Sequence, residues 1–265
     1  MTAVTALYLH GLPGSFASEM EIVFGPGKSP RYLVALERLV TLSEEHSYDT
    51  AVLGAFDRVA SAHRYTGPIR LVGFSLGAMP ALRIAAARSD RIASLDLIAP
   101  AAPLQLGNFL DGMAGKPVFE AAQQDGYRLG LLTRIQSTGL KLTPDLIARY
   151  LFAAAPDGER SLMGTTERRK AFLSGMKHCL HEHSRAYKAE LRAYVTDWSD
   201  TLPKVTTPVR IWQGTDDNWT PAVMARALSA SLGGPTEVTF LNGLSHYGAL
   251  VQSLPTIIAQ NAAQI

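Results

Sequence analysis

The sequence predicts an α/β fold with a mostly parallel sheet and one helical insertion. Over roughly the first 100 residues, short apolar runs alternate with segments of helical period, as they do in β-α-β units. Residues 104–203 contain no convincing strand, and the alternation returns at Val209. One α/β core interrupted by helices is the simplest account of this order. We therefore expect a core formed by residues 1–103 and 204–265, and a helical cap formed by residues 104–203.

The composition is that of a globular protein, because 47% of the 265 residues are hydrophobic and 18% are charged. The 25 basic and 23 acidic residues give a net charge of +2, which is too small for a nucleic-acid partner. The single cysteine, Cys179, excludes an intramolecular disulfide and a cysteine-based zinc site. No run of 18 apolar residues occurs and no basic leader opens the chain, so we expect no membrane partner and a cytoplasmic location.

The expected strands are short apolar runs bounded by glycine, proline or polar residues. They are Thr5 to Leu9, Tyr32 to Leu36, Pro68 to Gly73, Ile92 to Ile98, Val209 to Gln213 and Glu237 to Leu241. The expected helices of the core are Ser18 to Phe24, Asp49 to Ala62, Leu76 to Arg88, Pro221 to Leu232 after an N-cap at Thr220, and a tail from Tyr247 that breaks near Pro255. The expected cap helices are Pro117 to Leu132, Pro144 to Ala154 and Thr166 to Tyr194.

The motif Gly73-Phe74-Ser75-Leu76-Gly77 has the form G-x-S-x-G and lies between an expected strand and an expected helix. A nucleophilic serine at such a sharp turn needs glycine on both sides, because a Cβ atom at those positions would clash. This context favours Ser75 as a nucleophile over a plain turn of small residues.

The loop His10-Gly11-Leu12-Pro13 follows the first expected strand. Acyl transfer needs two backbone N–H groups that point at the developing oxyanion. The candidates are the amides of Leu12 and of Leu76, the residue after the serine, whereas Pro13 has no N–H to donate. We expect His10 to shape this loop without transferring a proton.

Two later loops carry an acid and a histidine. Gly214-Thr215-Asp216-Asp217 follows the fifth expected strand, and His246 follows the sixth. Neighbouring side chains in a turning segment point apart, and the G-x-x-D spacing from Gly214 favours Asp217 as the partner of the histidine. Asp216 is then left to bond turn amides or water.

With these motifs, the sequence resembles alpha/beta-hydrolase fold proteins that use a serine nucleophile. The chain order Ser75, Asp217, His246 is the order of that family, and the resemblance covers residues 4–103 and 204–265. It implies a three-layer α/β sandwich. The chain opens at the strand before His10, so we expect a sheet of about six strands whose exposed edge favours a homodimer.

The resemblance implies hydrolysis of a small carboxylic ester or a related acyl bond. Ser75 would attack the carbonyl carbon, His246 would accept its proton, and Asp217 would hold the imidazole tautomer. The implied partner is a small-molecule substrate, and no cofactor is implied. Three aromatic neighbours of these residues are expected to line the substrate pocket: Phe74, Trp219 and Tyr247.

The same triad serves other chemistries, so three alternatives stay open. It can hydrolyse a carbon–carbon bond beside a ketone, act as a lyase on a cyanohydrin, or persist in a ligand receptor with residual turnover. Ser75 excludes the dehalogenases and epoxide hydrolases of this fold, whose nucleophile is an aspartate. The histidine-rich segment around His178, His181 and His183 has no persuasive carboxylate or cysteine to complete a ligand set, so we expect no metal.

Overall fold

The computed structural model describes residues 6–42, 47–65, 67–124 and 126–262. Its centre is a six-stranded sheet with the order β2-β1-β3-β4-β5-β6, in which every neighbouring pair is parallel. The strands are β1 (Ala6–Leu9), β2 (Leu33–Ala35), β3 (Ile69–Phe74), β4 (Ile92–Ile98), β5 (Val209–Gly214) and β6 (Thr236–Leu241). The predicted number and direction of strands are confirmed, while Thr5 lies outside the described residues.

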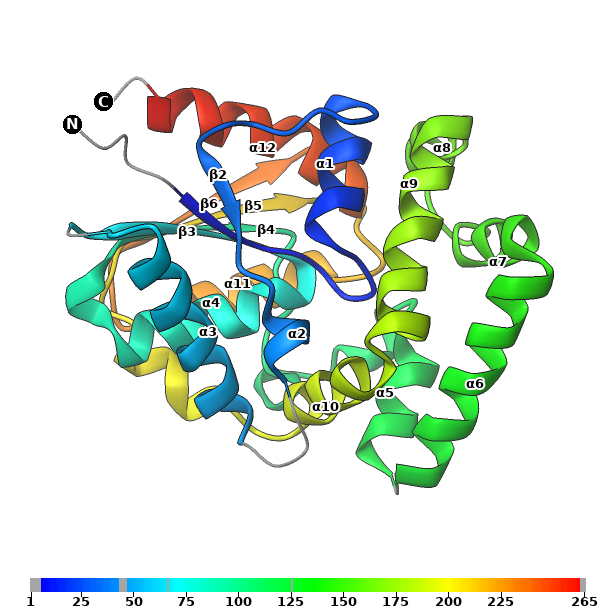
Figure 1. Ribbon diagram of the computed structural model, residues 1–265, viewed down its shortest axis with the longest axis horizontal. Coiled ribbons are helices and arrows are strands. Elements are labelled where there is room, and N and C mark those ends of the chain that lie inside the picture. Colours follow the sequence, from blue (N-terminus) through cyan, green and yellow to red (C-terminus); the bar gives the residue numbers. More distant parts are fainter. Residues whose placement is uncertain (1–5, 43–46, 66, 125, 263–265) are drawn as a thin grey trace.

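Helices cover both faces of this sheet. The core helices are α1 (Phe16–Phe24), α2 (Arg38–Thr41), α3 (Tyr48–Ala62), α4 (Ala78–Ala87), α11 (Ala222–Ser231) and α12 (His246–Ala262). Figure 1 shows α1 and α12 on one face and α3, α4 and α11 on the other, which gives three layers. The central strands are nearly continuous apolar runs, because a parallel sheet covered by helices is buried on both faces.

The described residues between β4 and β5 form helices and no strand. The α-helices are α5 (Lys116–Gln123), α6 (Gly126–Leu142), α7 (Pro144–Leu151), α8 (Asp157–Met163), α9 (Thr166–Lys177) and α10 (Ser184–Val195). They lie together at one side of the sheet (Figure 1). None of the helices in the described part of the chain is long and apolar enough to cross a membrane.

Two helices expected in this segment are wrong in extent. The expected helix from Thr166 to Tyr194 is divided by a π-helical turn at His178–Glu182. Its apolar pattern continues through the break, so periodicity alone did not show it. The helix expected from Pro117 to Leu132 is two helices, α5 and α6, and α8 was not expected at all.

Two expected proline effects are also wrong. Pro221 is the N-cap residue of α11 and not its first helical residue, and the Thr220 side chain points back to the acid turn instead of capping the helix. Helix α12 continues through Pro255. Pro255 lies on the solvent side, where water can hydrate the carbonyl that loses its partner, while buried Leu254 and Ile257 hold the helix on the sheet.

The parallel arrangement brings the loops that follow the strands to one edge. Leu9 of β1 is in register with Gly73 of β3, and Gly214 of β5 is in register with Leu241 of β6. Ligand sites in open α/β sheets form outside the carboxyl ends of the strands. The candidate residues that follow β1, β3, β5 and β6 therefore leave the sheet at this same edge.

Candidate active site

Ser75 lies on a sharp turn between β3 and α4, with a φ of 55° that a non-glycine residue rarely adopts. The two flanking glycines make the turn possible. A Cβ on Gly73 would lie 2.9 Å from the carbonyl oxygen of Gly77, and a Cβ on Gly77 would collide with the carbonyl oxygen of Leu9 in β1. The G-x-S-x-G motif thus has a steric cause in this fold, and the serine is held in a strained conformation at the strand ends.

The loops after β5 and β6 bring Asp217 and His246 together. His246 Nδ1 lies 2.8 Å from Asp217 Oδ2, and both side chains are buried. When Nδ1 donates to the carboxylate, the other ring nitrogen, Nε2, is the one that can accept a proton. This is the relationship that a general base and its orienting acid require.

The turn before α11 holds the Asp217 carboxylate in place. The backbone N–H groups of Trp219 and Thr220 donate to Asp217 Oδ1 at 2.8 and 3.0 Å. The Thr220 hydroxyl and the Gln213 amide lie 3.0 and 3.3 Å from Oδ2. Asp216 is exposed and accepts from the Thr215 hydroxyl, whereas Asp217 is the aspartate that contacts His246.

The structure does not join Ser75 to His246 by a hydrogen bond among the described residues. Phe74, the residue before Ser75, contacts the histidine instead: its ring centroid lies 4.7 Å from that of the His246 imidazole. Hydrogen bonds between a nucleophile and its base are commonly long or poorly aligned without substrate and tighten when it binds. Ser75 and the Asp217–His246 pair therefore lie at the same edge of the sheet, without a hydrogen bond between Ser75 and His246.

The loop after β1 is held by the buried carboxyl of Glu19 on α1. Glu19 Oε1 accepts the Gly11 N–H at 2.9 Å, and Oε2 accepts the Tyr8 hydroxyl at 2.7 Å. Burial raises the pKa of Glu19 from 4.5 to about 8, and these two hydrogen bonds only partly oppose that shift. The Leu12 N–H donates to no described residue. Leu76 directly follows Ser75 in the turn.

His10 and Arg38 also hold the loop after β1 in place. His10 is buried, its Nδ1 lies 2.7 Å from the carbonyl oxygen of Gly11, and burial together with the charge of Arg38 lowers its pKa well below the usual range. Arg38 donates to the His10 carbonyl at 2.8 Å and forms a fully buried ion pair with Glu190 of α10. A histidine kept neutral in this way fits the expected loop-shaping role, and the ion pair ties the loop to the helical segment.

Glu159 is a further residue of the site that the sequence analysis missed. This buried carboxylate on α8 accepts the N–H groups of Tyr247 and Gly248 at 2.7 and 3.0 Å. They are the second and third residues of α12, which begins at His246. Burial raises the pKa of Glu159, against the opposing effect of the two amides. No local motif indicates it, because its partners lie 88 and 89 residues away.

The three aromatic residues expected at the pocket surround the imidazole. The ring centroids of Trp219 and Tyr247 each lie 5.7 Å from that of His246, and Phe74 is closer still. Phe152, the residue after α7, packs against Trp219 and Tyr247. Two surface cavities near the helical segment are lined by other residues, so a substrate-binding role for the three rings stays a prediction.

A group of potential metal ligands lies at the π-helical turn. The donor atoms of His178, Glu182 and His183 all lie within 4.8 Å of one another, and His178 Nδ1 is 3.1 Å from Glu182 Oε2. The sequence analysis did not count Glu182 with this cluster. His181, which it did consider, instead has Nε2 at 3.0 Å from the carbonyl oxygen of Ser137.

The profile of the alpha/beta hydrolase family matches residues 6–259. The chain belongs to this family. Its Ser75 turn follows β3, and its Asp217 and His246 follow β5 and β6 at the same edge of the sheet. No curated protein matches the sequence.

Several solved structures share the fold of this alpha/beta hydrolase. MenH from S. aureus superposes with a TM-score of 0.65 at 14% identity, covering 100% of this chain and 95% of that one. The esterase RhEst1 from Rhodococcus sp. ECU1013 has a TM-score of 0.64 at 17% identity, with 99% and 90% covered. A proline iminopeptidase from Mycobacterium smegmatis has a TM-score of 0.61 at 19% identity, with 99% and 90% covered. At these identities the likeness establishes the fold, and function has to be argued from the site.

Proposed function

We propose that this alpha/beta hydrolase is a serine hydrolase that cleaves a small carboxylic ester or a related acyl bond. The observation that carries the proposal is the buried 2.8 Å contact between Asp217 and His246, beside the strained turn that presents Ser75. A serine alone is a weak nucleophile and needs an adjacent base, and the base in turn needs an orienting group. The name of RhEst1 as an esterase agrees with this reaction class.

In the first half of the reaction, Ser75 Oγ attacks the substrate carbonyl carbon. The new O–C bond forms as the Oγ proton passes to His246 Nε2, and the carbonyl electron pair moves onto oxygen. The backbone N–H groups of Leu12 and Leu76 stabilise this oxyanion, each at about 3 kcal/mol in comparable sites. Collapse of the intermediate breaks the bond to the alcohol oxygen, which leaves with the proton from His246.

In the second half, water hydrolyses the acyl-enzyme on Ser75. His246 removes a proton from water, the hydroxide oxygen bonds to the acyl carbon, and the ester bond to Oγ breaks with return of the proton. Asp217 does not itself take the proton, and it stabilises the imidazolium that forms twice in each cycle. The balance requires only the substrate and water, so no cofactor enters the scheme.

In this proposal, residues 104–203, which contain the helices between β4 and β5, form a cap over the site. Support comes from contacts that link this segment to the site: Phe152 packs on Trp219 and Tyr247, and Glu159 holds the start of α12. A cap over the strand ends excludes water and forms one wall of the pocket. The expected substrate is a small molecule enclosed between Phe74, Tyr247 and the cap.

Hydrolysis of a series of p-nitrophenyl esters of increasing acyl length tests the proposal. We expect saturable turnover with one preferred chain length, and covalent labelling by a serine-directed phosphonate. Turnover of a vinylogous diketone without ester cleavage would favour carbon–carbon hydrolysis, and cyanide release from a cyanohydrin would favour a lyase. Very slow turnover of all substrates, together with ligand-induced thermal stabilisation, would favour a receptor.

Chelation tests the expectation of no metal in the reaction. We expect unchanged ester turnover after dialysis against EDTA, because the proposed scheme uses only protein groups: the side chains of Ser75, Asp217 and His246 and two backbone N–H groups. Loss of turnover that zinc restores would contradict the scheme and point to the cluster of His178, Glu182 and His183.

A further inference from the structure

The outer face of α6 and α7 exposes an unusual number of apolar side chains. Nine large hydrophobic residues are exposed among the described residues, and six of these, with exposed fractions of 47–77%, lie on the two helices. They are Tyr127, Leu131, Ile135, Leu142, Leu146 and Tyr150. The two helices form the end of the molecule opposite the termini (Figure 1). Single exposed apolar residues are ordinary, but a concentration of them on adjoining helices marks an interaction surface.

The same helices carry basic charge. Helix α6 contains Arg128, Arg134 and Lys141 and no acidic residue. The acid of α7, Asp145, is paired with Arg169 of α9 at 3.1 Å. Exposed apolar side chains together with an excess of Lys and Arg are the composition of helices that lie on anionic lipid surfaces.

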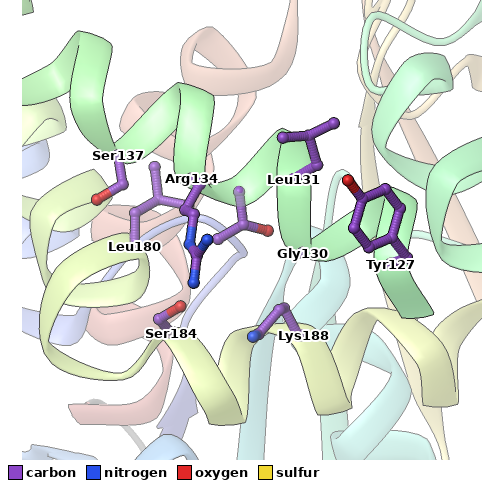
Figure 2. A pocket seen from close by; sticks show the side chains of 9 residues that line it. Tyr127, Gly130, Leu131, Arg134, Ser137, Leu180, Ser184 and Lys188 are labelled. Carbon is purple, nitrogen blue, oxygen red and sulfur yellow. The ribbon is translucent and has the colours of Figure 1, made fainter.

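A cavity of about 560 Å³ lies beside this face, between α6 and α10. Figure 2 shows Arg134 of α6 and Lys188 of α10 on its two sides, with the hydroxyls of Ser137 and Ser184 nearby. No acidic residue lines the cavity, and neither Arg134 nor Lys188 forms an ion pair with a described residue. Two cations and several hydroxyl groups around one space are suited to an anionic group such as a phosphate.

The exposed face and the cavity share residues. Tyr127 and Leu131 line the cavity and are also among the exposed apolar side chains. Tyr127, Leu131 and Ile135 are spaced four residues apart, so they follow one side of α6 next to Arg134. An anion held in the cavity would thus have apolar surface directly beside its binding site.

We propose that the face of α6 and α7 docks on an anionic lipid surface, with a lipid phosphate received between Arg134 and Lys188. The exposed apolar side chains enter the boundary between headgroups and acyl chains, and the basic residues contact the headgroups. Docking of this kind needs no apolar span, so it is compatible with the finding that no described helix could cross a membrane. It departs from the expectation of no membrane partner, which was drawn from the lack of a long apolar run. The proposal is independent of the reaction at Ser75.

Charge argues against a second copy of the chain on this face. In a two-fold dimer the patch would meet itself, and each copy would bring more basic than acidic residues against the other, because α6 has no acid and α7 has only Asp145. An anionic surface neutralises these charges instead. The expected homodimer, if it forms, would therefore use another surface.

Co-sedimentation of the full chain with lipid vesicles tests the proposal. We expect binding to vesicles of phosphatidylglycerol mixed with phosphatidylcholine, little binding to phosphatidylcholine alone, and weakening as salt is raised. The variant Arg134→Glu/Lys188→Glu should bind more than about tenfold more weakly. Its matched control, Lys28→Glu/Arg31→Glu, reverses two charges in the exposed loop before β2 and should bind like the parent.

A second pair of variants tests the apolar part. Leu131→Ser/Ile135→Ser should lose vesicle binding. Tyr32→Ser/Val40→Ser, which removes two exposed apolar side chains from the surface of the α/β part of the protein, should keep it. Each variant is first shown to keep the parent melting temperature and its turnover of a soluble ester.

Several results would overturn the proposal. They are no binding to the anionic vesicles, equal binding to neutral ones, or equal losses in the control variants. Binding of inorganic phosphate without vesicle binding would assign the cavity to a soluble anion. The face would be assigned to a second copy if the parent binds no vesicles and light scattering shows that it is a dimer. In that case Leu131→Ser/Ile135→Ser should be a monomer.

Discussion

The carboxylate of Glu159 accepts the backbone N–H of Tyr247 at 2.7 Å, and Tyr247 directly follows His246. A residue of the helical segment therefore caps the helix whose first residue is the candidate base. A carboxylate at a helix N-terminus satisfies unpaired amides and interacts favourably with the helix dipole. We expect this contact to fix the start of α12 and, with it, the place of the His246 side chain.

We expect Glu159→Gln to lower kcat by about tenfold to a hundredfold with a smaller change in KM, since a small displacement of a catalytic group can cost that much. The glutamine keeps the shape but presents an NH₂ to one of the two amides. Asp157→Asn, an exposed position on the same helix, should leave kcat unchanged. Steady-state kinetics on one soluble ester and the rate of phosphonate labelling measure the effect. Equal losses in both variants, or a change in KM alone, would remove Glu159 from a positioning role.

Separate replacement of Asp216 and Asp217 shows which of the two neighbouring acids orients His246. Asp217→Asn should lower kcat by about 10⁴, because an amide favours the wrong imidazole tautomer. Asp216→Asn should cost less than about tenfold, since the Asp216 side chain is exposed and, among the described residues, accepts only from the Thr215 hydroxyl. Thermal melts establish that both variants fold before kcat is compared. A crippled Asp216→Asn enzyme beside an active Asp217→Asn enzyme would reverse the assignment.

Removal of the nucleophile should abolish turnover. We expect Ser75→Ala to lower kcat by about 10⁴ to 10⁶ and to keep the fold, because a small side chain is replaced by a smaller one. A serine-directed phosphonate should add one adduct to the parent, on the peptide containing Ser75, and none to the variant. Mass spectrometry of the digested protein measures this. A variant that retains a tenth of the parent rate would exclude Ser75 from the mechanism.

The buried carboxyl of Glu19 makes stability depend on pH. Its pKa is about 8 in the folded protein against 4.5 for the unperturbed group. Between these values the unfolded chain releases the proton while the folded protein keeps it, so the free energy of unfolding falls as pH rises from about 4.5 to 8. Each pKa unit corresponds to about 1.4 kcal/mol, which makes the expected loss several kcal/mol.

Glu19→Gln, which cannot ionise, should flatten this dependence, whereas Glu21→Gln on the same helix should not. Urea unfolding at pH 5, 6.5 and 8, compared as differences between variants, isolates the contribution of Glu19. An unchanged slope in Glu19→Gln would show that Glu19 is ionised in the folded protein across this range.

Much of this architecture was determined by the sequence alone. Six apolar runs separated by helical segments predicted the parallel sheet, because such strands must be buried on both faces. The glycines around Ser75 indicated the turn that carries the candidate nucleophile, and the spacing from Gly214 indicated the turn that carries Asp217. These signals are local: each depends on backbone sterics or side-chain direction within a few residues.

Only the tertiary structure decided what depends on contacts between distant segments. Glu159 and Glu19 show no motif in the sequence, yet burial beside specific amides makes one a cap for α12 and the other an anchor for the loop after β1. The π-helical turn after Lys177 and the uninterrupted helix at Pro255 are also set by packing, which overrides local propensity. The physical reason is that desolvation and close packing depend on neighbours that the fold brings together, and no local pattern of residues encodes them.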